Sequence, residues 1–154
     1  MMANDQLVIF LVNGLRLALP LMSIRQVVAA AYASPLPGAP ASVSGVIDLQ
    51  GEMVAVLDMR ARLALPSRAL QPGDCFLIVE LQDRALAVWA DEVEGVAEVR
   101  GEPQDVSAFL PDDEERILQA LGRAGHGIIL IQDPAKFFSP RQARELDEAL
   151  EHAA

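Results

Sequence analysis

The stretch SGVIDLQGEMVAVLDMR, residues 44–60, predicts a β-hairpin that leads into a short helical turn. Residues 46–49 and 53–57 are mostly apolar and long enough for strands, and Gly51 lies in the turn between them, where a positive φ angle is common. Asp58 follows the second strand and precedes MRARL, where a carboxylate can accept hydrogen bonds from free backbone amides and so begin a helix. The rest of the chain can be compared with this pattern.

The two halves of the chain contain similar segments in the same order. The segment LVIFLVNGLRLALPLMSIRQV (7–27) aligns with FLIVELQDRALAVWADEVEGV (76–96) at a shift of 69 residues and without a gap. Farther on, after a small insertion, MVAVLDMRARL aligns with IILIQDPAKFF, which places Asp58 on Asp133. Any two hairpins share alternating apolar residues, but the ungapped register continues from the hairpin into the segment after it, and this favours an internal duplication.

The opening segment predicts a hairpin and a short helix. Residues 7–12 and 15–20 are apolar runs of strand length, and Asn13 with Gly14 between them is a pair that tolerates the positive φ angles of a tight turn. The segment 22–28 is then predicted to be helical, because its apolar residues recur at helical spacing: Ile24, Val27 and Val28.

Two copies of a small antiparallel unit are too few for a solenoid, which needs at least three stacked units. They predict instead two small β units, each hiding its own strand edges, that share an interface and unfold together. The chain PSRALQPGD, residues 66–74, is the predicted join. A C-terminal helix follows, with Ser139 and Gln142 as a capping box and an apolar stripe on one face: Ala143, Leu146 and Leu150.

The composition excludes several function classes. A net charge of -10 over 154 residues argues against binding to nucleic acid. The apolar runs are far too short to span a membrane, and no basic region precedes the first of them as it would in a signal peptide. The single cysteine, Cys75, cannot form an internal disulfide. These observations predict a cytoplasmic protein that does not insert into the membrane.

No catalytic, metal or cofactor site is predicted from the residues. The two histidines, His126 and His152, lie in a turn and near the end of the chain, with no evident nucleophile as partner. Cysteine and histidine pairs with metal-ligand spacing and glycine-rich phosphate loops are absent from the sequence. Asp58 or Asp91 could serve as a base in a small enzyme, since each follows an apolar strand. Three similar placements, Asp58, Asp91 and Asp133, favour helix capping instead.

The residues 44–60 resemble the hallmark of CheW-like domains, in which G-V-I-N-L-R-G is followed by four or five mostly apolar residues and then D-L-R. The resemblance extends from about Gln6 to the last helix. It includes the opening LVIFLVNGLRLALPLMSIRQVV, the segment AVWADEVEGV, the ending GIILIQDPAKFFS and an LP..P motif at Leu36, Pro37 and Pro40.

This resemblance implies a mainly β fold of two SH3-like five-stranded β-barrels packed around a shared core, with short helices and a C-terminal α-helix. The whole chain, 1–154, would be one CheW-like domain, with one subdomain at about 15–66 and a second at about 74–132, which the N-terminal strand and the C-terminal helix complete. CheW-like proteins have no catalytic activity and no cofactor. They couple the cytoplasmic helical tip of a transmembrane chemoreceptor to the CheW-like regulatory domain of the histidine kinase CheA, within membrane-associated receptor arrays.

The resemblance also implies two docking faces. Gln26 and Gln50 stand at receptor-facing positions, and the apolar side chains beside them would contact a receptor helix if they are partly exposed: Leu21, Ile24 and Val27. Each of these three is equally compatible with an ordinary place in the core. Gly45 and Asp48 stand at the kinase-contact region, although a glycine at the start of a strand also allows another backbone segment to approach closely.

Three departures from the family pattern concern the partner. Family members often carry an acid at the position of Gln26, asparagine at Asp48 and arginine at Gln50. Glutamine at positions 26 and 50 removes the charges of that acid and that arginine, and with them their electrostatic steering of a partner. Exposed contacts of this kind contribute only about 0.2–1 kcal/mol each. An auxiliary CheW-like adaptor that serves pili or a second-messenger pathway is therefore an alternative to a conventional coupling protein.

Overall fold

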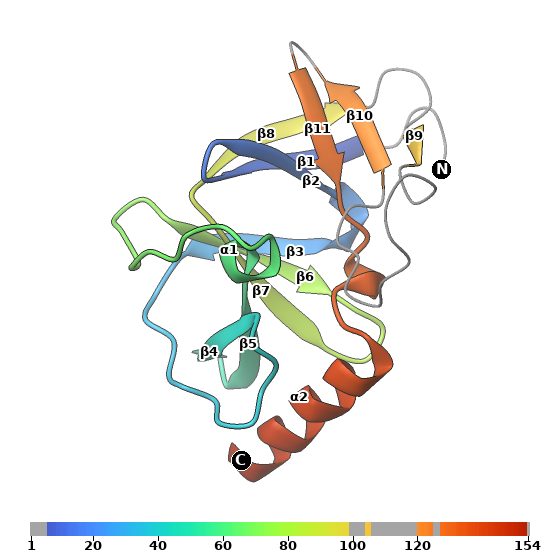
Figure 1. Ribbon diagram of the computed structural model, residues 1–154. Coiled ribbons are helices and arrows are strands. Elements are labelled where there is room, and N and C mark those ends of the chain that lie inside the picture. Colours follow the sequence, from blue (N-terminus) through green and yellow to red (C-terminus); the bar gives the residue numbers. More distant parts are fainter. Residues whose placement is uncertain (1–5, 99–103, 106–119, 125–126, 154) are drawn as a thin grey trace.

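The protein consists of two β-sheets and a C-terminal helix, shown in a computed structural model that describes residues 6–98, 104–105, 120–124 and 127–153 (Figure 1). The elements follow in the order β1 (Gln6–Val12), β2 (Leu15–Pro20), the 3-10 turn η1 (Leu21–Ser23), β3 (Ile24–Ala29), β4 (Val43–Leu49), β5 (Glu52–Asp58), α1 (Met59–Arg62), β6 (Cys75–Glu80), β7 (Ala85–Ala90), β8 (Glu92–Glu98), β9 (Gln104–Asp105), β10 (Ala120–Ala124), β11 (Gly127–Ile131), η3 (Pro134–Lys136) and α2 (Pro140–Ala153).

The predicted hairpins are confirmed. β1 pairs with β2 in antiparallel register across the turn at Asn13 and Gly14, and β4 pairs with β5 across the turn at Gln50 and Gly51. All four turn residues have positive φ angles, from 52° at Asn13 and Gln50 to 91° at Gly51. Such angles match the twist of a two-residue hairpin turn, which explains why Gly51 stands there.

Each sheet takes strands from both halves of the chain. The six-stranded sheet has the order β8-β1-β2-β11-β10-β9, and the five-stranded sheet has the order β3-β6-β7-β5-β4. In Figure 1 the six-stranded sheet fills the upper part of the view and the five-stranded sheet the lower part. The hydrogen-bonded sheets thus do not follow the ranges 15–66 and 74–132, and the subdomain division stays a prediction.

The internal duplication accounts for this strand order. The equivalent strands of the two repeats are β1 and β6, β2 and β7, β3 and β8, β4 and β10, and β5 and β11. When each strand is exchanged for its equivalent, the order β3-β6-β7-β5-β4 becomes β8-β1-β2-β11-β10. The two repeats have therefore exchanged their opening hairpins, so that β1 and β2 complete the sheet of the second repeat, and β6 and β7 complete that of the first.

The strand registers match residue by residue. Val27 of β3 pairs with Leu77 of β6, and the equivalent residues at the shift of 69, Val96 and Val8, pair in the other sheet. Both pairings contain a β-bulge, and the extra residues of the two bulges are equivalent as well: Arg25 and Glu94. Coincidence of hairpin patterns does not produce equivalent bulges, so the duplication is established by the structure.

The largest buried cluster lies between the two sheets, where a shared core was expected. It includes Phe10 and Leu17 from the six-stranded sheet and Leu77 and Leu86 from the five-stranded sheet. Leu146 of α2 joins this cluster, and Ser139 and Gln142 form the predicted capping box through hydrogen bonds of 2.9 and 3.1 Å. Separate clusters cover the far face of each sheet.

The helix predicted at 22–28 is wrong, because this segment is η1 followed by strand β3. β-branched residues favour a strand where a partner strand is available, and β6 supplies that partner. The bulge at Arg25 also interrupts the alternation of apolar and polar residues, so the segment lacked a clear strand signal.

Within the described part of the chain, no helix is long and apolar enough to cross a bilayer.

Gln132 gives a stability prediction from the duplication. It is 1% exposed and its amide oxygen has no hydrogen-bond partner among the described residues, whereas the equivalent residue of the first repeat is the buried Leu57. Since an unsatisfied buried polar group is destabilising, Gln132→Leu should raise the free energy of unfolding by about 1 kcal/mol. Urea denaturation measures the change, with the exposed Gln82→Leu as a control that should give no such gain. A loss of stability in Gln132→Leu would contradict the unsatisfied state of this amide.

Candidate docking surfaces

Asp91 binds three separate parts of the chain. Its carboxylate accepts hydrogen bonds from Nη1 and Nη2 of Arg60 at 2.7 and 2.6 Å, from Nη2 of Arg68 at 2.8 Å and from the backbone amide of Asn13 at 2.9 Å. The prediction that Asp91 caps a helix is wrong, because strand β8 follows it. No local pattern indicates that two arginines, one from α1 and one from the predicted join, would converge on this carboxylate.

Asp74 extends this cluster of ion pairs. It is 6% exposed and accepts hydrogen bonds from both terminal nitrogens of Arg68 at 2.8 and 2.9 Å, from the amide of Gln71 at 3.0 Å and from Nε1 of Trp89 at 3.0 Å. Burial raises the pKa of Asp74, but these hydrogen bonds outweigh it and lower the pKa to about 2. We call Arg60, Arg68, Asp74 and Asp91 the ion cluster.

The ion cluster is unsuited to proton transfer. Burial acts to raise the pKa of Asp91, but hydrogen bonds from Arg60 and Asn13 and the charges of both arginines lower it below its ordinary value. A general base needs a pKa near the working pH and a free lone pair for the substrate proton.

Asp58 and Asp133 have the predicted capping geometry. The carboxylate of Asp58 accepts hydrogen bonds from the amides of Arg60 and Ala61, and that of Asp133 accepts one from the amide of Ala135. Among the described residues, no group of acids, cysteines and histidines is arranged to hold a metal ion.

The predicted receptor-facing residues of η1 and β3 do not all point to the same side of the five-stranded sheet. Leu21 and Ile24 are half-buried against the core between the sheets. Val27 is 46% exposed and shares the face of its cross-strand neighbour Leu77, which belongs to that core. Gln26 pairs with Ile78 and therefore faces the opposite side. The structure thus packs Leu21 and Ile24 against the shared core, places Val27 on the core side of β3, and puts Gln26 on the opposite side.

Arg25 connects β3 to the turn that contains Gln50. Its guanidinium forms ion pairs with Glu80 at 2.7 Å and with Glu52 at 3.1 Å, two residues beyond Gln50. The hydrogen bonds to Glu80 and Glu52 raise the pKa of Arg25. Gln50 is exposed, and the turn that contains it is linked to β3 through the ion pair of Arg25 with Glu52. Arg25 could not be identified from the sequence, because its acidic partners are distant along the chain.

Gly45 and Asp48 lie three residues apart on β4 and have different surroundings. A Cβ atom at Gly45 would stand 2.4 Å from the carbonyl oxygen of Ser34, whose backbone is hydrogen bonded to Val46. Gly45 thus permits the close backbone approach expected of it. Asp48 is exposed near the other end of the strand, and its carboxylate accepts a hydrogen bond of 2.7 Å from the amide of Gly51.

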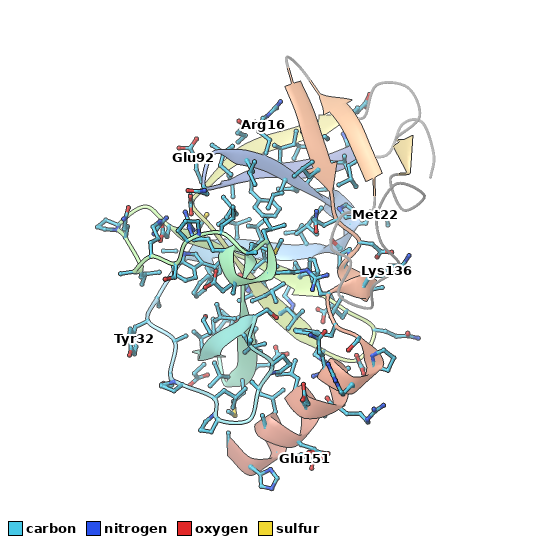
Figure 2. All side chains as sticks on the ribbon, viewed as in Figure 1. Arg16, Met22, Tyr32, Glu92, Lys136 and Glu151 are labelled. Atoms are coloured by element: carbon cyan, nitrogen blue, oxygen red, sulfur yellow. The ribbon has the colours of Figure 1, made fainter. Side chains whose placement is uncertain are left out.

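The two most exposed large apolar side chains of the described residues belong to none of the predicted sites. Met22 is 98% exposed at η1, and Tyr32 is 83% exposed in the chain between β3 and β4. Figure 2 shows them at opposite sides of the molecule, both pointing away from its body, with Lys136 on the side of Met22. An isolated exposed apolar residue carries little information, but Tyr32 adjoins further apolar surface.

Comparison with known proteins gives a consistent result. Residues 6–142 match the model of the CheW-like domain family. The chain is 25% identical to the chemotaxis protein CheW of Treponema pallidum, covering 95% of this chain and 91% of the relative, and 25% identical to that of Rhizobium meliloti, covering 91% and 90%. The crystal structure of the scaffolding protein TtCheW from Thermoanaerobacter tengcongensis is similar in fold, with a TM-score of 0.78 at 18% identity, covering 90% of this chain and 95% of that one.

The lowered pKa of Asp74 predicts a specific acid sensitivity. A carboxylate whose pKa falls from 3.8 when unfolded to about 2 when folded stabilises the protein above pH 4 and loses that contribution between about pH 4 and pH 2. Asp74→Asn should therefore lower the free energy of unfolding at pH 7 by about 2 kcal/mol and reduce its fall in that pH window. Urea denaturation at several pH values tests this, with the exposed Glu145→Gln as control. An unchanged acid profile in Asp74→Asn would contradict the assignment.

The close approach at Gly45 predicts a structural cost for any side chain there. Gly45→Ala should lower the free energy of unfolding by about 1–3 kcal/mol, since Ser34 or β4 must move to admit the methyl group. The neighbouring Ser44→Ala is the control and should change stability by less than about 0.5 kcal/mol. Equal stability of the two variants in thermal unfolding would show that the backbone has room at Gly45.

Proposed function

Because this chain belongs to the CheW-like domain family, we propose that it ties the cytoplasmic helical tip of a chemoreceptor to the regulatory domain of a CheA-type histidine kinase. Proteins of this family are noncatalytic chemotaxis scaffolds, and this chain is one of them. In the proposed mechanism two separate surfaces of one rigid body hold the two partners in a fixed arrangement, so that a rearrangement of the receptor changes the activity of the kinase.

The position of Val27 carries the receptor side of the proposal. It exposes 46% of its surface on the core side of β3, the side to which the half-buried Ile24 also points, and Leu21 of the preceding η1 packs against the same core. An amphipathic helix binds to a row of apolar side chains on the receiving protein, and these three residues supply such a row beside the shared core. Gln50 would stand at the rim of the receptor surface, and the ion pairs of Arg25 would hold β3 and the β4–β5 turn in place beneath it.

Gln26 takes a different place in the proposal. It faces the side of the sheet opposite Val27, so it would position β3 rather than contact a receptor helix laid against Val27. The neutral side chains Gln26 and Gln50 leave apolar contact as the main source of receptor affinity, with less electrostatic steering than an acid and an arginine would give. The auxiliary adaptor, with a different regulator as partner, remains the alternative that this substitution pattern favours.

The kinase surface would lie at the end of β4 that contains Gly45. Gly45 itself offers no side chain to a partner, and its substitution disturbs folding, so its exposed neighbour Ser44 is the better probe. Asp48 would contribute by fixing the β4–β5 turn through its bond to the Gly51 amide. We further propose that the protein acts in the cytoplasm and is recruited to membrane-associated receptor arrays through these two surfaces.

Binding to two purified partners tests this assignment. Val27→Glu should weaken binding to a chemoreceptor helical hairpin about tenfold and leave kinase-domain binding within about twofold, because it places a charge on the apolar row. Ser44→Arg should instead weaken binding to the kinase domain about tenfold and leave receptor binding within about twofold. Isothermal titration calorimetry against the receptor tip and the CheA-type regulatory domain of the same organism gives both affinities.

Val96→Glu is the matched control for Val27→Glu. Val96 is the repeat-equivalent residue on β8, is 54% exposed and pairs with a core residue in the same register. The Val96→Glu variant should bind both partners as the unmodified protein does. Equal loss of receptor binding in the two variants, or loss of both partners in either, would contradict two separate surfaces. Recovery of a different regulator in place of receptor and kinase, in a pull-down from native cytoplasm, would favour the auxiliary adaptor.

A further inference from the structure

A pocket of about 530 Å³ opens on the far face of the five-stranded sheet, away from the core shared by the two sheets. Its floor is formed by Val56, Phe76 and Trp89, which are buried side chains of β5, β6 and β7. Its walls come from two connecting segments, residues 31–35 after β3 and residues 68–70 before β6. Pockets that bind small molecules usually enclose roughly 300–1,000 Å³ and have mostly apolar walls, and this one fits both criteria.

The pocket gathers an unusual share of the aromatic residues. The chain has five phenylalanines, one tryptophan and one tyrosine, and the pocket is lined by both the tryptophan and the tyrosine, Trp89 and Tyr32, together with Phe76. Trp89 is 9% exposed and Tyr32 is 83% exposed, so one ring lies deep in the pocket and another stands at its rim. Aromatic rings bind other rings in offset-stacked and edge-to-face arrangements. The lining therefore favours an aromatic guest.

The charge at the pocket wall is already neutralised. Among the described residues, Arg68 is the one charged residue that lines the pocket, and its guanidinium pairs with Asp74 and Asp91 at 2.8 Å. It also lies over the ring of Trp89, with 5.8 Å between the guanidinium carbon and the ring centroid. A charged guest would enter an apolar site without an unpaired counter-charge, and desolvation would oppose this. Ser44 supplies a hydroxyl that can hydrogen bond to a polar substituent.

We propose that this pocket is a binding site for a small uncharged aromatic compound with a single ring, such as a phenol. The ring packs against Trp89 and Phe76, Tyr32 covers it at the rim, and Ser44 is available to a hydroxyl group. This site lies on the opposite face of the five-stranded sheet from Val27, so it is separate from the proposed receptor surface. Its test needs neither a receptor nor a kinase.

The single tryptophan provides a direct reporter. Nε1 of Trp89 donates a hydrogen bond to Asp74, and its proton gives the only indole signal in a ¹H–¹⁵N spectrum of the full chain. Titration with 4-methylphenol should shift this signal saturably, with a Kd of about 1 mM, the range expected for so small a ligand. Benzoate and benzylamine should bind at least about fivefold more weakly, because each brings a charge. A shift that stays linear to about 20 mM, or equal binding of benzoate, would overturn the proposal.

Variants at the wall locate the binding site. Ala69→Phe places a ring at a wall residue and should weaken 4-methylphenol binding at least about tenfold, while Ala41→Phe, at an exposed residue outside the pocket, should leave it unchanged. Tyr32→Ser removes the exposed rim ring without touching the core and should weaken binding about threefold even if Ala69→Phe fails to fold. Unchanged affinity in both wall variants, or equal loss in Ala41→Phe, would place binding elsewhere and overturn the assignment.

Discussion

The fixed geometry of this protein depends on the carboxylate of Asp91, which binds α1, the segment before β6 and the β1–β2 turn at one point. The turn belongs to the six-stranded sheet, while Arg60 and Arg68 adjoin the five-stranded sheet. Removing charges from water is costly, and a buried ion pair often adds little net stability compared with apolar residues. Its geometric requirement is strict, however, because loss of one partner leaves a buried charge uncompensated. The ion cluster thus links the β1–β2 turn of the six-stranded sheet to the segments beside the five-stranded sheet.

The exchange of hairpins between the repeats makes the two halves interdependent. Each sheet contains a parallel pair that crosses between repeats, with Leu130 beside Leu17 in one and Ala55 beside Leu86 in the other. Neither sheet can form from one half of the chain alone, so its long-range pairings must be made together. The sequence showed the duplication, but it could not show the exchange. Equivalent strands of the two repeats have equivalent apolar faces, so each opening hairpin could bury its apolar residues in either sheet.

The sequence predicted the elements whose signals are local. Asn13 with Gly14, Gln50 with Gly51, and the caps at Asp58, Asp133 and Ser139 all act within a few residues of themselves, and the structure has them as expected. The errors came where distant residues decide the outcome. β3 is a strand because β6 pairs with it, and Asp91 binds arginines that are 31 and 23 residues away in sequence. The candidate docking residues could be named only by family resemblance, since the exposure of a side chain and the side of the sheet to which it points depend on the completed sheets.

Strand β3 links the two faces of the five-stranded sheet. Val27 lies on the side of the shared core, and the next residue, Val28, pairs with Phe76 and packs on the side of the pocket. Neighbouring residues of a strand point to opposite faces, so a movement of β3 changes both at once. Backbone pairing to β6 and the two ion pairs of Arg25 resist such a movement. If a partner binds at Val27 as proposed, the force is consequently carried into the sheet as a whole.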